Sequence, residues 1–181
     1  WNRPLTGNIS NDQHIGNVEL GFVRTKGLSS IYQFNNFIEG NSYQGIRHNL
    51  VNRYNSKNFN GQYSGSYLTS NDKITSTNFY RHKTFAYQKL GKVKLGYVDD
   101  FENNKFILDS TRRFTPRTYQ FWEWEGSISS ADSSVNFMKL FYKERRDKQA
   151  YNNEVKDSTM ATNIGFQANI NSIKNNPFSV Y

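Results

Sequence analysis

Cysteine is absent from this 181-residue sequence, and proline occurs only three times. Without cysteine the chain has no disulfide framework and no thiolate metal site. Long apolar runs are missing as well. A membrane-spanning helix needs about 20 mostly apolar residues, so the sequence contains no such helix. This does not exclude membrane-spanning β-strands, because each strand of a barrel gives a much weaker signal.

Hydrophobic residues are scarce, at 35% of the chain with a mean hydropathy of −0.83. Compact globular domains usually carry about 45–50%. Disorder is nevertheless a poor explanation, because aromatic residues make up 16% of the chain, including 14 Phe and 12 Tyr, and disordered chains are poor in aromatics. The apolar content is concentrated in large rings, which suits strands and membrane interfaces.

The formal net charge is +8, but the 23 Lys and Arg residues are dispersed. The one dense charged run, from Lys143 to Lys148, mixes both signs and is typical of a solvated loop. The basic and aromatic segment at 78–83 has no RNA-binding signature beside it. We therefore expect no nucleic-acid partner.

Alternation of side chains is the main structural signal. Clusters of Asn, Ser, Thr and Gly recur about every 10 to 19 residues, as turns would. The segments between them alternate with period two, which predicts β-strands. The clearest example carries rings and glycines on one face, at Phe59, Gly61, Tyr63, Gly65 and Tyr67.

The predicted strands are long. About ten are expected, several of about 10 to 13 residues, whereas soluble strands commonly have about 5–6 and membrane-crossing strands about 9–11. We predict an all-β, antiparallel up-and-down meander in a single domain, 1–181, that forms an outer-membrane-type barrel or a segment of a larger one. The longest connections, 99–105, 109–117 and 145–158, are predicted as exposed loops.

Trp122, Glu123, Trp124 and Glu125 form the candidate ligand-contact segment. On a strand, Glu123 and Glu125 share one face about 7 Å apart. Glycosidases hold paired carboxylates about 5–9.5 Å apart, and tryptophan rings can stack on sugars. The competing interpretation is that both carboxylates face water or pair with cross-strand Lys or Arg.

No catalytic, cofactor or metal site is predicted. His14, His48 and His82 are spaced evenly, but no short ligand pair of the kind that zinc sites use accompanies them. The oxygen-rich segment from Asp99 to Asn104 lacks the pattern of a calcium-binding loop. A phosphate-binding glycine loop is missing too.

Two segments carry a resemblance to a known group of proteins. Residues 54–64 (YNSKNFNGQYS) and 130–142 (SADSSVNFMKLFY) resemble hairpins of large cell-envelope β-proteins of the Bacteroidota, such as the outer-membrane barrels of the type IX secretion translocon and gliding-motility proteins. The resemblance spans about residues 15–171 and implies that this chain is a fragment of a longer barrel. Tyr181 ends the sequence as a barrel's last strand often does, but Pro177 and Ser179 break the alternation before it.

We therefore expect a structural or transport role for a β-barrel segment in the outer membrane or at the cell surface, with secretion among its processes. Outer-membrane lipid and other envelope proteins are the expected partners, and no enzymatic activity is expected. The alternative is a soluble secreted β-sandwich or barrel that binds carbohydrate or another ligand through Trp122 and Trp124. A glycosidase that uses Glu123 is the least favoured reading.

Overall fold

The computed structural model describes residues 13–24, 27–40, 43–72, 75–108, 116–131, 136–152, 154–170 and 178–180. These residues form nine long strands and one short one. The strands are β1 (Gln13–Arg24), β2 (Leu28–Glu39), β3 (Tyr43–Asn55), β4 (Phe59–Asp72), β5 (Thr75–Leu90), β6 (Val93–Leu108), β7 (Arg117–Ser130), β8 (Asn136–Tyr151), β9 (Glu154–Ile170) and β10 (Phe178–Val180). Over these ranges there is no helix long and apolar enough to cross a membrane.

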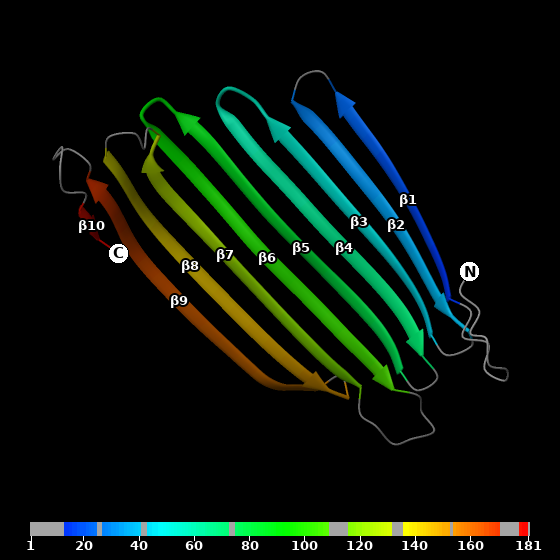
Figure 1. Cartoon of the computed structure of the whole chain (residues 1–181). Coiled ribbons are helices and arrows are strands. Elements are labelled where there is room, and N and C mark those ends of the chain that lie inside the picture. Colours follow the sequence, from blue (N-terminus) through cyan, green and yellow to red (C-terminus); the bar gives the residue numbers. More distant parts are fainter. Residues whose placement is uncertain are drawn as a thin grey trace.

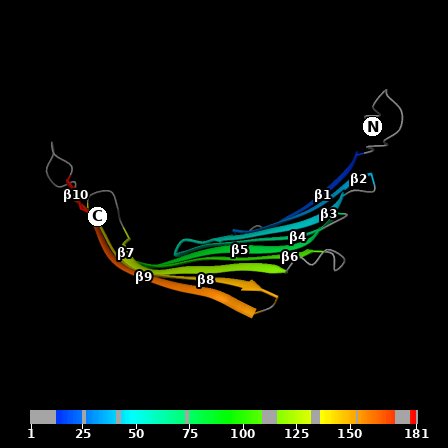
Figure 2. The same ribbon diagram turned by 90° about the horizontal axis from the view of Figure 1, so that it is seen from below.

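The strands form a single antiparallel sheet whose spatial order is the order of the sequence (Figure 1). The predicted up-and-down meander is therefore confirmed. Figure 2 shows that the sheet is one layer thick and curved. Within the described residues it is not closed into a barrel, because β1 and β9 lie at or near opposite edges and do not pair with each other.

Two of the three predicted long loops are wrong. Residues 99–105 lie inside β6, and residues 145–158 belong mostly to β8 and β9. Each segment contains a charged residue that pairs across strands, Asp100 with Arg81 and Arg145 with Glu123. A charge-rich segment is predicted to be an exposed loop when only the sequence is known, because its cross-strand partners are then unknown. Of the third predicted loop, residues 109–115 lie outside the described residues.

The strands are also longer than expected, with 16 residues in β5, β6 and β8 and 17 in β9. At about 3.3 Å per residue, a strand of this length extends about 50 Å. Short turns join them. The β5–β6 turn uses Gly91 and the β8–β9 turn uses Asn152, both with positive φ, as the tight hairpin turns that follow strand twist require.

Gly27 and Gly91 both have left-handed backbones, but only Gly27 is crowded. A Cβ at Gly27 (φ +81°) would lie 1.9 Å from the backbone oxygen of Asn55, whereas a Cβ at Gly91 (φ +62°) would meet nothing within 4 Å. Gly27 also accepts a hydrogen bond from the Asn55 N–H, at 2.9 Å. The turn before β2 is therefore packed directly against the end of β3.

We predict that Gly91→Ala lowers the free energy of unfolding by about 1 kcal/mol, the cost of a left-handed alanine. Gly27→Ala should cost clearly more, because backbone must also move. Denaturant unfolding followed by tryptophan fluorescence measures both losses. Equal losses in the two variants would show that the contact with Asn55 does not constrain the turn.

Candidate functional site

The sheet has two faces of different chemistry. Because successive residues of a strand point to opposite sides, residues that are paired across strands share a face. One cross-strand row runs through Leu20, Tyr32, Leu50, Gly65, His82, Phe101, Trp122, Arg146 and Met160. We call this side the aromatic face. The adjacent row on the other side, the charged face, runs through Gly21, Ile31, Val51, Ser64, Lys83, Asp100, Glu123, Arg145 and Ala161.

Most exposed large apolar side chains lie on the aromatic face. They are Val18, Leu20, Phe22, Leu50, Tyr54, Tyr67, Leu90, Val93, Leu95, Tyr97, Trp122, Ile128, Met138, Leu140, Met160, Ile164 and Phe166. On the charged face, Ile15, Val23 and Phe106 belong to that exposed group, and Val155 lies beyond the register shift in the β8–β9 pairing.

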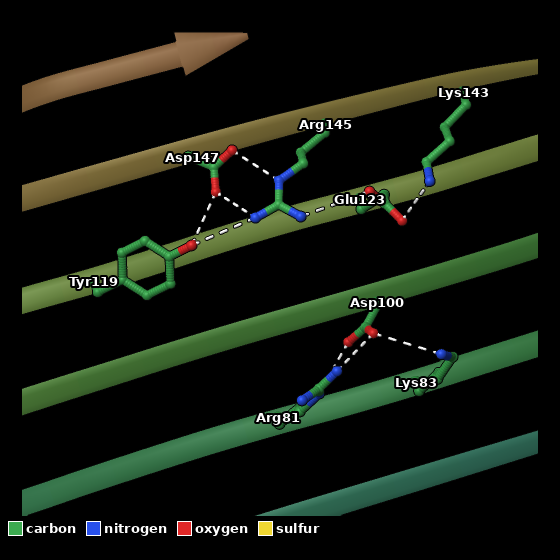
Figure 3. Close-up of polar contacts among 8 residues, drawn as sticks. All are labelled: Arg81, Lys83, Asp100, Tyr119, Glu123, Lys143, Arg145 and Asp147. Carbon is green, nitrogen blue, oxygen red and sulfur yellow. Dashed lines mark hydrogen bonds and ion pairs between the residues drawn. The ribbon is translucent and has the colours of Figure 1, made fainter. Parts of the chain in front are cut away.

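The charged face is organised by ion pairs across β5, β6, β7 and β8 (Figure 3). Arg81 donates two hydrogen bonds to Asp100, from Nε at 3.1 Å and from Nη2 at 2.9 Å. Lys83 lies 3.7 Å from the same carboxylate. Such two-pronged guanidinium contacts are geometrically specific as well as favourable.

A second cluster on this face joins β7 and β8. Lys143 contacts Glu123 at 2.9 Å, and Arg145 lies 3.8 Å from the same carboxylate. Arg145 also donates to Asp147, which accepts a further bond from the Tyr119 hydroxyl at 3.0 Å. Lys139 and Glu125 form a separate ion pair on the same face. Together, the two clusters and this pair contain five cations and five carboxylates, so the network is neutral: Arg81, Lys83, Lys139, Lys143, Arg145, Asp100, Glu102, Glu123, Glu125 and Asp147.

The four predicted ligand-contact residues are divided between the two faces. Trp122 and Trp124 lie on the aromatic face, while Glu123 and Glu125 lie on the charged face. Glu123 pairs with Lys143 and Arg145, and Glu125 pairs with Lys139, so the cross-strand pairing considered from the sequence is what the structure contains. A single sugar cannot lie against both the rings and the carboxylates, which removes the geometry behind a combined carbohydrate site.

The histidines recur at equal spacing because two strands and two turns separate them. They fall on β1, β3 and β5, on the aromatic face. His82 Nε2 lies 2.9 Å from Asp99, and its Nδ1 lies 3.1 Å from the Tyr80 hydroxyl. Its ring stacks against Phe101. In the described part of the chain, no three His, Asp or Glu residues are grouped as metal ligands.

Sequence reasoning missed a shallow groove of about 310 Å³ on the aromatic face. It is lined by Phe101, Gln120, Trp122, Arg146 and Lys148. Alternation alone places Arg146 and Lys148 on one side of their strand, and Gln120 and Trp122 on one side of theirs. That the two pairs meet depends on the β7–β8 register, in which Trp122 is opposite Arg146 and Gln120 is opposite Lys148.

The comparisons with known proteins add no name to this picture. No family model matches the chain, and no curated protein matches it.

We predict that Asp100→Asn destabilises the sheet by about 1–2 kcal/mol, because Arg81 and Lys83 lose a carboxylate whose side chain is only 14% exposed. Glu154→Gln is the matched control, since its side chain is 72% exposed and pairs only with Lys156 among the described residues. It should cost at most about 0.5 kcal/mol. Denaturant unfolding of both variants at low and high salt tests this, and equal effects would contradict it.

Proposed function

We propose that this sheet is a wall segment of an outer-membrane-type β-barrel, with the aromatic face toward lipid and the charged face toward the barrel interior. Its role is structural, in transport or secretion, and involves no catalysis. The single observation that carries the proposal is the separation of exposed apolar side chains from ion-paired ones across one layer. Outer-membrane barrels have this arrangement, with an apolar outer band and a polar interior.

The apolar band crosses the strands obliquely. In β1 to β3 it includes the row of Leu20, Tyr32 and Leu50. In β6 to β9 it includes the row of Leu95, Ile128, Leu140 and Phe166. On β7 the second row lies six positions beyond the first, from Trp122 to Ile128. The band therefore shifts by about one residue per strand.

That slope has a direct geometric meaning. With about 3.3 Å per residue and about 4.8 Å between strands, a shift of about one residue per strand corresponds to a tilt of about 35–40°. Strands of outer-membrane barrels tilt by about 35–45° from the membrane normal. A band that is level in the membrane must cross tilted strands at this slope, so the pattern supports a membrane-facing surface.

The edges of the sheet also favour a larger wall. β1 has all of its described side chains exposed and pairs only with β2 in the described residues. Long uncovered edge strands promote aggregation, and barrels remove them by closure. The nine long strands cannot close by themselves with antiparallel pairing, because β1 and β9 run in the same direction. Further strands are therefore part of the proposal.

Two buried carboxylates, Asp99 and Glu144, lie in one cross-strand row of the aromatic face, on either side of Trp124, and Glu144 pairs with Arg146. Asp99, on β6, is only 6% exposed, and its partner His82 is held by Tyr80, whose hydroxyl contacts that of Tyr63 at 3.2 Å. Rings of Tyr63 and Phe101 stack on the two sides of His82. Because these polar groups are bonded to one another and covered by rings, the band can include them at a reduced cost.

Labelling at two adjacent residues tests which face meets lipid. Asn163 and Ile164 are both exposed, but lie on the charged and the aromatic face respectively. The chain has no cysteine, so Asn163→Cys and Ile164→Cys each give a single labelling site. In bilayers, an environment-sensitive dye at 164 should show blue-shifted emission that a lipid-chain quencher reduces, while a dye at 163 should resemble a dye in water.

Similar quenching at both positions would contradict the assignment of faces. A second measurement tests the membrane class itself. The folded chain should require detergent or lipid and resist unfolding by SDS at room temperature. A monomeric, well-folded chain in plain buffer would overturn the proposal.

A further inference from the structure

The cations on the two faces of β8 have different partners. On the charged face, Lys139, Lys143 and Arg145 all contact carboxylates. On the aromatic face, Arg146 pairs with Glu144, but Lys148 is exposed and has no carboxylate partner within the described ranges. The aromatic face therefore keeps an uncompensated positive charge at this position.

The surroundings of Lys148 form a site with both ionic and apolar parts. Lys148 and Arg146 line one side of the groove, and Gln120, Trp122 and Phe101 line the rest. The Arg146 guanidinium lies 5.8 Å from the centre of the Trp122 ring, within the range of a cation–π contact. A ligand with an anionic head and an apolar body would match both parts.

The groove also lies at the boundary of the apolar band. Along β7 and β8, Trp124 and Glu144 come next on one side of the groove, followed by Ile128 and Leu140 of the apolar band. The opposite end of the groove is polar, with its own Gln120 and Lys148 and, beyond them, Thr118. Trp122 and Trp124 stand between the two regions, as interfacial aromatic residues do in membrane proteins. Lys148 is thus placed where lipid phosphates would lie.

We propose that this groove binds the phosphate of an anionic lipid headgroup, with Lys148 and Arg146 as the cationic contacts, Gln120 as a hydrogen-bond donor, and Trp122 and Phe101 against the start of the acyl chains. The proposal rests on the proposed function, since it requires the aromatic face to meet lipid. It adds a lipid class and a binding position. A lipid is favoured over a free anion because the groove places the Phe101 and Trp122 rings beside its two cations.

The test measures which lipid lies next to the tryptophans. The full chain, with Trp1→Phe so that only Trp122 and Trp124 emit, is placed in phosphatidylcholine bilayers containing phosphatidylglycerol. Bromine is carried either on the chains of the anionic lipid or on those of the zwitterionic lipid. The ratio of the two quenching efficiencies, at equal mole fraction, gives the preference for the anionic lipid. The chain should prefer it, and Lys148→Gln should lower the preference by about fivefold, which is about 1 kcal/mol.

Lys83→Gln is the matched control, because it removes the same charge from the charged face, where Lys83 pairs with Asp100. It should leave the preference unchanged. An unchanged preference in Lys148→Gln, or an equal loss in Lys83→Gln, would overturn the site. Loss of the preference on adding millimolar inorganic phosphate would overturn the lipid as its ligand. If the proposed function itself is wrong, neither brominated lipid will quench Trp122 and Trp124 in the chain that carries only Trp1→Phe.

Discussion

Cross-strand register is the constraint on which this structure depends. The sheet has one layer in the described residues, so each side chain finds its contacts on neighbouring strands and not in a second layer. A slip of one residue in any pairing would move every side chain of a strand to the opposite face. The neutral ion-pair network and the exposed aromatic face both exist because eight successive pairings keep the same phase, up to the register shift between Gln149 and Ala150 at the end of the β8–β9 pairing.

The two faces of the sheet differ in their side chains and in how those side chains are stabilised. The charged face pairs its ions, because a carboxylate such as Asp100 is largely removed from water. The aromatic face leaves large apolar side chains uncovered, which a water-exposed single layer would not favour. Of its two ion pairs, His82 with Asp99 is enclosed by tyrosine and phenylalanine rings, and Arg146 with Glu144 lies beside the Trp122 ring. This division is what makes a membrane wall the function that the geometry supports best.

The candidate groove illustrates how far sequence reasoning extends. The spacing of Trp122 and Trp124 placed both rings on one face of a strand, and the separation of Glu123 and Glu125 onto the other face follows from the same alternation. The contribution of Arg146 and Lys148 was not recognisable. They lie more than 20 residues further along the chain, and only the β7–β8 register brings them opposite Trp122 and Gln120.

Alternation in the sequence by itself determined that the chain forms strands, and short turns determined that they follow one another as a meander. The prediction from the sequence was wrong for residues 99–105 and 145–158, because their many charged residues are typical of an exposed loop. Tertiary structure decided those segments, because Arg81 and Lys83 meet Asp100, and Glu123 meets Arg145, only across strands. It also decided the slope of the apolar band. Local sequence sets which side a residue takes within its strand, but the position of one strand against the next is a long-range property.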